Sequence, residues 1–179
     1  MNIWEEIFKG IGDERHAFCG PHTVQIDLTD RCNNSCIACW VHSPLLDEKE
    51  IFPRGKKELP FDRVKQLIDQ LHSLGTTEII LSGSGEPFIY PHIQEVIRLI
   101  KEKGMYLNII TNASLLNKDT IRLLVDCKVD LITASIWAGT SRAYVNTHPG
   151  RDEKDFESLK ENLKDLARQK DQRVFCCLT

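Results

Sequence analysis

Three cysteines in one short stretch are the residues of this sequence best suited to chemistry. Cys32, Cys36 and Cys39 are separated by three and then two residues, so their side chains can turn toward one small metal centre. Thiolates are soft ligands that suit iron–sulfur clusters and zinc. A cubane cluster usually takes four cysteines, so three close cysteines without an obvious fourth indicate a cluster with one iron left open. An open coordination position is typical of a reactive metal site rather than a structural one.

Other interpretations of these cysteines stay open at the level of the residues. They could be unreactive core thiols, although dense clustering disfavours this. A structural zinc site would need a fourth ligand, for which His42 and Cys19 are candidates. Disulfides are disfavoured because the seven cysteines are an odd number and no secretory segment precedes them.

Length and composition limit the class of protein. With 179 residues, 41% of them hydrophobic, we expect one globular domain with a substantial core. The net charge of -3 disfavours nucleic acid as the main partner. No apolar run approaches the roughly 20 residues that a membrane-spanning helix needs. The first residues are acidic and carry no hydrophobic signal core, so we expect a cytoplasmic protein.

Strand-like and helix-like patterns alternate along the chain. Helical spacing of apolar residues predicts an outer helix over 4–11, which we expect to pack on the outside of the domain, and four more helices that alternate with the strands. Strands are predicted over 23–28, 78–81, 105–110, 130–135 and 173–178, and the later helices over 61–74, 91–103, 117–125 and 156–166. This order favours a parallel α/β sheet covered by helices.

Two parallel architectures fit such an order, a Rossmann-type sheet and a (β/α) barrel. The only glycine-rich turn after a strand, Gly83 to Phe88, lacks the third glycine of the dinucleotide fingerprint and places an acid where a phosphate would sit. We therefore predict a partial (β/α) barrel, (βα)4β, over residues 20–179, preceded by a helical extension at residues 1–19.

The unusual residues follow the predicted strand ends. The cysteines follow the first strand, Gly83-Ser84-Gly85-Glu86-Pro87 the second, Thr111-Asn112 the third, and Ser135-Ile136-Trp137 closes the fourth. Reactive groups in parallel α/β folds gather at the carboxyl ends of the strands. We therefore expect these loops to converge on one edge of the sheet.

The cysteine stretch resembles a known family. Cys32-x3-Cys36-x2-Cys39 followed by Trp40 resembles the cluster loop of the radical S-adenosylmethionine (radical SAM) enzymes. The preceding residues 28–33 resemble the subgroup of the molybdenum-cofactor cyclase and the SPASM-type peptide- and protein-modifying maturases. The resemblance covers residues 20–179 as a radical SAM core domain. We expect this domain to be incomplete at its C-terminus, because the sequence stops inside an apolar strand.

The resemblance also implies roles for single residues. Cys32, Cys36 and Cys39 would ligate three irons of a [4Fe-4S] cluster, and SAM would chelate the open iron. The turn Gly83, Gly85, Glu86 and Pro87 is similar to the family's Gly-Gly-Glu-Pro element, which binds the amino group of SAM, although Ser84 intervenes. Trp40 would lie beside the adenine and sulfonium of SAM. Thr111 and Asn112 resemble the family's Thr-Asn-Gly turn, with Ala113 in place of glycine, and would also contact the cofactor. Ser135 would make a further contact.

The implied activity is reductive cleavage of SAM to a 5′-deoxyadenosyl radical that abstracts a hydrogen from a substrate. The subgroup suggests a peptide or protein as substrate, and an electron donor such as flavodoxin or ferredoxin as partner. Two alternatives remain: a non-catalytic zinc- or cluster-binding module, and an inactive fragment of a longer enzyme.

Several other residues have two interpretations. Trp137 stands where the family often has an acid, and it could be a core residue or part of a pocket wall. Arg142, Tyr144 and His148 could face a substrate, but solvated loop positions are favoured. Cys127, Cys176 and Cys177 are predicted to be buried packing thiols.

Overall fold

A parallel sheet forms the centre of the fold. The computed structural model of the chain describes residues 3–47, 58–169 and 176–178. Its strands are β1 (Thr23–Ile26), β2 (Glu78–Leu81), β3 (Tyr106–Thr111), β4 (Leu131–Ala134) and β5 (Cys176–Leu178), and they lie side by side in the order β1-β2-β3-β4-β5. Each strand neighbours the next one in the sequence, as in a singly wound barrel, whereas a Rossmann sheet reverses its strand order. The predicted α/β fold and partial (β/α) barrel are confirmed.

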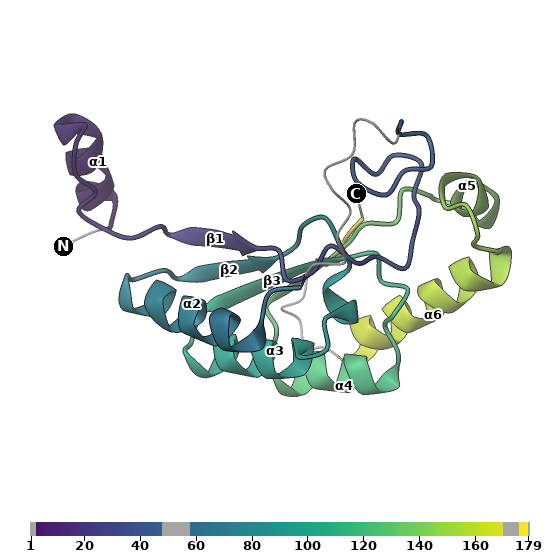
Figure 1. Ribbon diagram of the computed structural model, residues 1–179. Helices are drawn as coiled ribbons and strands as arrows, with labels where there is room; N and C mark the ends of the chain where they lie inside the picture. Colours follow the sequence, from purple (N-terminus) through teal and green to yellow (C-terminus); the bar gives the residue numbers. More distant parts are fainter. Residues whose placement is uncertain (1–2, 48–57, 170–175, 179) are drawn as a thin grey trace.

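One face of the sheet is the hydrophobic core. The register aligns Ile26, Leu81, Ile109 and Ile132 across four strands, and none is more than 4% exposed. Helices α2 (Phe61–Ser73), α3 (Ile93–Glu102), α4 (Lys118–Asp126) and α6 (Glu153–Gln169) cover this face (Figure 1). They bury apolar residues at helical spacing, such as Val64, Ile68 and Leu71 of α2. Burial of this apolar surface is the main force that holds helices and sheet together.

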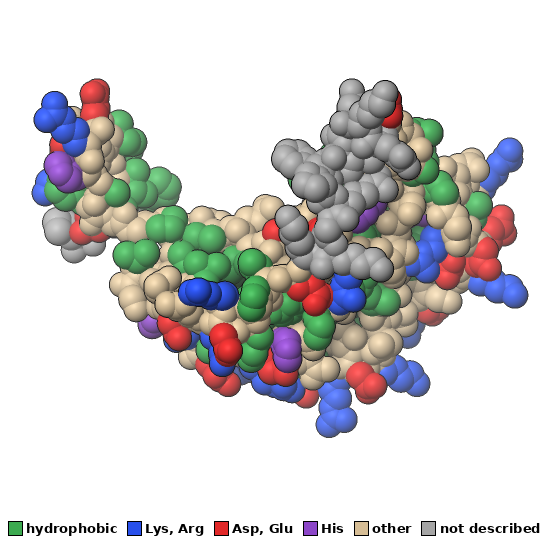
Figure 2. All heavy atoms as spheres, in the orientation of Figure 1, with side chains coloured by type: hydrophobic (Ala, Val, Ile, Leu, Met, Phe, Trp, Pro, Cys, Tyr) green, Lys and Arg blue, Asp and Glu red, His purple; other side chains and the backbone are tan. Residues whose placement is uncertain are grey.

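The opposite face of the sheet is half-exposed and partly polar. Thr23 donates a hydrogen bond to Glu78 across β1 and β2 at 2.7 Å, and Thr133 donates to Asn108 across β3 and β4 at 3.1 Å. In Figure 2, the surface drops away between α1 and the body of the molecule that contains the sheet. A polar, partly open inner face is what a barrel interior that receives a ligand requires.

The element boundaries follow local signals in the sequence. Pro60 precedes α2, and Gly75 follows it with φ 85°. Asn117 caps α4, since its side chain accepts from the Thr120 backbone N–H at 2.9 Å. Predicted strands 1 and 4 were too long at their ends, and predicted strand 3 lay one residue too early. Of predicted strand 5, residues 173–175 lie outside the described residues.

Among the described residues, two short helices were not predicted from the sequence. They are the 3-10 helix η2 (Pro87–Ile89) and α5 (Ser141–Thr147). Their apolar patterns are too short to show a period. Capping side chains start both of them, because Glu86 accepts from the Phe88 N–H and Thr140 accepts from the Ala143 N–H.

Helix α1 (Ile3–Asp13) forms as predicted but does not pack on the outside of the domain. It lies beyond the amino end of β1 (Figure 1), and Trp4, Phe8 and Ile11 are 59%, 68% and 66% exposed. That expectation was wrong because an amphipathic pattern predicts a helix and an apolar face, but not which surface meets that face. In the described part of the chain, no helix is long and apolar enough to cross a membrane.

Candidate functional site

The segment that leads into the cysteines is held by the glycine-rich turn after β2. The backbone N–H of Glu86 donates to the Arg31 carbonyl at 2.8 Å, and the N–H and hydroxyl of Ser84 donate to Asp27 at 2.8 and 2.7 Å. Arg31 forms an ion pair with Glu58 and also donates to the Ile89 carbonyl. The ends of β1 and β2 are therefore tied together directly before Cys32.

Packing against backbone requires glycine at position 85 of this turn, and Gly83 lies directly against the Asp27 side chain. A Cβ at Gly85 would lie 2.2 Å from the Thr29 carbonyl oxygen and 2.5 Å from that of Arg31. A Cβ at Gly83 would lie 2.0 Å from the carboxyl carbon of Asp27. Glycine allows two backbone segments to approach closely. The sequence suggested close approach to a ligand, whereas the structure shows that the turn also presses against the segment before Cys32.

Glu86 is a buried carboxylate that joins the second and third strand ends. Only 2% of it is exposed, and it accepts from the Thr111 hydroxyl at 2.7 Å, the Asn112 N–H at 2.8 Å and the Phe88 N–H at 3.1 Å. Burial raises the pKa of Glu86, while these donors oppose the rise. A buried carboxylate with fixed donors is a rigid group that can present negative charge to a cation.

The turn after β3 carries this network to the cysteines. The Asn112 side-chain amide lies 3.8 Å from the Cys32 sulfur and donates to Asn33 at 2.9 Å. Ser114 closes the network, since it donates to the Asn112 side-chain oxygen at 2.7 Å and accepts from Asn33 at 2.8 Å. Ala113 has φ 59°, in the left-handed region that favours glycine, which accounts for the glycine of the related Thr-Asn-Gly turn.

The three cysteines of the loop lie close enough to affect one another. The charges of Cys32 and Cys39, after the larger effect of burial, raise the pKa of the Cys36 thiol to about 11. Burial also raises the pKa of Cys32. Backbone N–H groups point at the sulfurs: Asn34 N lies 3.5 Å from the Cys32 sulfur, and His42 N lies 3.1 Å from that of Cys39. Cysteine thiols lose their protons when they bind a metal.

This donor set fits a cluster better than a single ion. In the described residues, no group of three or more His, Cys, Asp or Glu side chains is placed to hold one metal ion. In a cubane each cysteine binds a different iron, so the cysteine sulfurs lie farther apart than the ligands of a single metal ion do. Three neighbouring half-buried thiols with N–H donors aimed at two of them match that requirement. The proposed fourth zinc ligands, His42 and Cys19, complete no single-ion site.

A second support for the cysteine loop comes from α5 and the residues after it. Tyr144 and His148 stack with ring centroids 4.2 Å apart, and each is only 1% exposed. The prediction of solvated loop positions was therefore wrong for both, because α5 turns one side toward α6 and the loop. Arg142 is exposed, as predicted. The Ile37 N–H donates to the Thr147 carbonyl at 3.0 Å, which joins α5 to the loop.

Arg151 supports the loop from this side, although no signal in the sequence pointed to it. Arg151 donates to the Asn34 side-chain oxygen at 2.8 and 2.6 Å and to the Asn33 carbonyl at 2.9 Å. Arg151 lies 117 positions from Asn34 and 118 from Asn33 in the sequence, so only the folded chain reveals the contact.

Ser135, Trp40 and Trp137 lie on the loops that follow the strand ends. The Ser135 N–H donates to the Thr111 carbonyl at 2.8 Å, which places it beside the third strand end. Trp137 is 53% exposed, has φ 55° and donates to the Ser135 hydroxyl at 2.7 Å. It is therefore not a core residue. Trp40 is 69% exposed, so its indole ring is open to a ligand.

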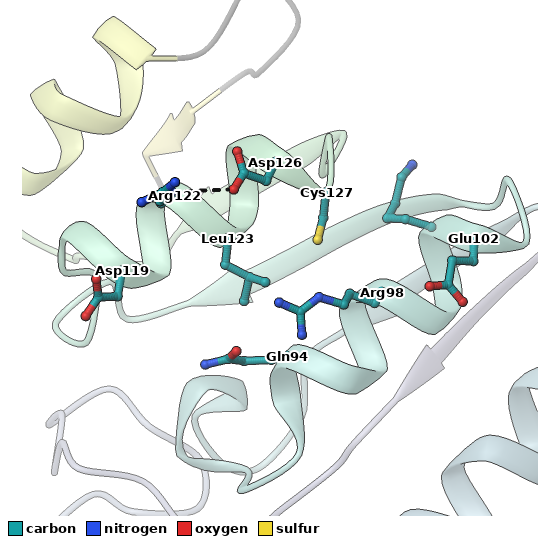
Figure 3. A pocket seen from close by; sticks show the side chains of 9 residues that line it. Gln94, Arg98, Glu102, Asp119, Arg122, Leu123, Asp126 and Cys127 are labelled. Carbon is teal, nitrogen blue, oxygen red and sulfur yellow. Dashed lines mark ion pairs between the residues drawn. The ribbon is translucent and has the colours of Figure 1, made fainter.

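Two other features do not belong to this site. Cys127 ends α4, is half-buried and packs against the core, as predicted, whereas the side chains of Cys176 and Cys177 lie outside the described ones. A groove of about 710 Å³ lies between α3 and α4 and is drawn in Figure 3. Its lining residues come from the outer sides of these helices and include Arg98, Arg122 and Asp126.

Comparison with known proteins identifies the family. Residues 26–177 match the family model of the radical SAM superfamily, so the chain belongs to this superfamily. Its enzymes use a [4Fe-4S] cluster together with S-adenosylmethionine, and these are the cofactors that the site must hold. The family assignment, and the cofactors that the resemblance of the cysteine stretch implied, are confirmed.

The individual relatives have several activities. The chain is 34% identical over 115 residues to the PqqA peptide cyclase of Rhodopseudomonas palustris, an alignment of 64% of this chain and 28% of that protein. It is 30% identical over 126 residues to the AdoMet-dependent heme synthase of Methanosarcina barkeri, covering 70% of this chain and 34% of that protein. These alignments span about a third of each relative.

A solved structure shows the same fold. SuiB of Streptococcus suis, bound to S-adenosylmethionine, superposes with a TM-score of 0.66 at 20% identity, covering 92% of this chain and 36% of that protein.

Proposed function

We propose that this chain is the core of a radical SAM enzyme that binds a [4Fe-4S] cluster through Cys32, Cys36 and Cys39. The observation that carries the proposal is the convergence of the cysteine loop with Glu86 and Asn112. When bound, the reduced cluster would supply the electron that cleaves SAM into methionine and a 5′-deoxyadenosyl radical, and this radical would abstract a hydrogen atom from the substrate.

The residues of the chain hold and orient these cofactors. Glu86 fixes the turn after β3 by accepting from Thr111 and Asn112, so Asn112 points at Cys32. The loop of Gly83, Gly85 and Pro87 offers backbone groups to the amino end of SAM, next to the negative charge of Glu86. Ser135 offers a hydroxyl at the fourth strand end, and Trp40 offers an exposed aromatic face to the sulfonium and adenine.

The substrate class rests on the relatives. A peptide or protein substrate is proposed because one relative is a peptide cyclase. Cleavage consumes an electron, so a low-potential donor such as flavodoxin or ferredoxin is the proposed partner. Reduced thiols fit the cytoplasm. The core domain is proposed to run from residue 20 to 179, with residues 1–19 as a separate helical extension.

Anaerobic reconstitution tests the proposal. The purified chain is supplied with iron and sulfide, and bound iron and sulfide are measured. We expect about four of each per chain and a brown protein. Dithionite and SAM are then added, and 5′-deoxyadenosine is measured by chromatography.

Two cysteine variants serve as a matched pair. Cys36→Ala should lose the cluster, whereas Cys127→Ala should load normally, since Cys127 ends α4 away from the loop. One zinc per chain without SAM cleavage would instead support a non-catalytic module. A chain that binds neither metal nor SAM would support an inactive fragment.

A further inference from the structure

The guanidinium of Arg151 holds the centre of the cysteine loop. It makes two bonds to the Asn34 side-chain oxygen and one to the Asn33 carbonyl. Asn34 is 5% exposed, and the Arg151 side chain is 21% exposed. Hydrogen bonds from a charged donor are stronger than neutral ones, and they gain further when water is excluded. This is therefore a strong contact rather than a surface one.

Arg151 is itself held in place by α5 and α6. Its backbone N–H donates to the His148 carbonyl at 3.0 Å, directly after the buried pair of His148 and Tyr144. On its other side, the Asp155 carboxylate of α6 lies 3.8 Å from the guanidinium. The arginine is thus fixed before it meets the loop, so it can determine where Asn34 lies.

Asn34 lies between two proposed cluster ligands. Its backbone N–H lies 3.5 Å from the Cys32 sulfur. Its side-chain nitrogen is buried and has no hydrogen-bond partner in the described part of the chain. This side chain lies close to two groups, the Cys36 thiol and the Tyr144 hydroxyl, and that hydroxyl is also buried without a hydrogen-bond partner in the described residues. A buried N–H without an acceptor is costly, and a negatively charged cluster sulfur is a stronger acceptor than a neutral phenol oxygen.

We propose that Arg151 is a positioning residue that orients Asn34, so that the Asn34 side-chain amide donates a hydrogen bond to the Cys36 sulfur in the loaded protein. Bonds from N–H groups to cluster sulfurs stabilise the reduced, more negative cluster and raise its reduction potential. Arg151 therefore both preforms the loop and tunes the centre. This inference rests on the proposed function, because it takes Cys36 as a cluster ligand.

The first test uses the full chain without iron. Hydrogen exchange is measured by mass spectrometry in residues 33–39 of the wild type and of Arg151→Gln. Loss of the charged contacts should speed exchange in this loop about tenfold. Arg122→Gln is the matched control, because Arg122 is an 82% exposed arginine of α4 that pairs with Asp126 at 3.7 Å. Exchange in the loop of this control should stay at the wild-type rate.

The second test measures the reduction potential of the reconstituted cluster by redox titration. Arg151→Gln and Asn34→Ala should each lower the potential, and the double variant should lower it no further, because both remove the same hydrogen bond. Arg122→Gln should leave it unchanged. A merely structural role of Arg151 would change loop exchange but not the potential of clusters that have formed.

Clear outcomes would overturn the inference. The inference is contradicted if residues 33–39 of Arg151→Gln exchange at the wild-type rate. It is also contradicted if neither Arg151→Gln nor Asn34→Ala changes the reduction potential of the cluster. If the Arg151→Gln chain exchanges fast throughout, the whole fold is destabilised and the loop cannot be judged from this variant. Loop exchange is then measured in Arg151→Lys, because lysine keeps the positive charge but lacks the forked donor of arginine. Wild-type loop exchange in that variant also refutes the inference. A wild-type chain that binds no cluster refutes the proposed function and the sulfur contact, whereas exchange in the iron-free chain reports separately on loop positioning.

Discussion

The carboxyl edge of the sheet and the groove between α3 and α4 are both rich in charged side chains, but they hold them differently. At the edge, Glu86 is 2% exposed and accepts hydrogen bonds from three residues on two segments. In the groove, the pair of Arg122 and Asp126 spans 3.7 Å within one helix, and the two side chains are 82% and 67% exposed. The groove is a hollow between helix surfaces, whereas the edge is a built network.

This difference shows why burial matters more than the size of a hollow. An exposed ion pair is solvated and contributes little to stability or to specific binding. A buried carboxylate must have its partners in place, because each unpaired donor around it is costly. Such a network persists when every member is satisfied, and it can then hold a ligand-binding loop in a single geometry.

The largest expected effect comes from removing the buried carboxylate. Glu86→Ala leaves three donors without their acceptor and should lower the free energy of unfolding by about 4 kcal/mol. The matched change in the groove, Asp126→Ala, should stay within about 0.5 kcal/mol of the wild type. Urea unfolding of the iron-free chain under reducing conditions measures both. Equal losses in the two variants would remove the distinction between edge and groove.

A methyl group at the edge should also be costly. Gly85→Ala places its Cβ against the backbone carbonyls of Thr29 and Arg31, so we expect a loss of about 2 kcal/mol and poorer iron loading. Gly139→Ala is the control, because its Cβ would have no neighbour within 4 Å. Iron per chain and thermal unfolding are compared for both variants. A normally loaded Gly85→Ala chain would show that this packing is not needed by the cysteine loop.

The pH dependence of stability should report the burial of Glu86. Its folded pKa is raised above the ordinary value of 4.5 by burial, so the folded chain binds this proton more tightly than the unfolded chain does. Stability from this group is therefore greatest at low pH and falls as the pH rises from about 4.5 through the folded pKa. Glu86→Gln should lack this fall. The difference between wild-type and variant unfolding free energies, measured at several pH values, gives the sign.

Outside the edge, substitutions should follow local backbone preferences alone. Lys128 follows α4 with φ 53° and is exposed, so Lys128→Gly should stabilise the chain by about 0.5 kcal/mol. Gly104 has φ 71° after α3, and Gly104→Ala should destabilise it by about 1 kcal/mol. Neither change should alter iron loading. A change in loading would mean that the groove side communicates with the cysteine loop.

The sequence by itself determined the order of the elements and the position of the chemistry. Apolar periodicity and local signals such as Pro60 and Asn117 act within a few residues, so they can be read directly. The spacing of Cys32, Cys36 and Cys39 is also local. Because parallel strands end on the same edge, the convergence of the loops that follow them could be predicted without coordinates.

Only the tertiary structure decided which side chains these loops use to hold one another. Glu86 was expected to meet a ligand ammonium, but its carboxylate also fixes the next strand end. The contact of Arg151 with Asn34, the burial of Tyr144 and the exposed apolar face of α1 left no local pattern. Each depends on which distant surfaces pack together, and that is determined by the free energy of the whole fold rather than by any short segment.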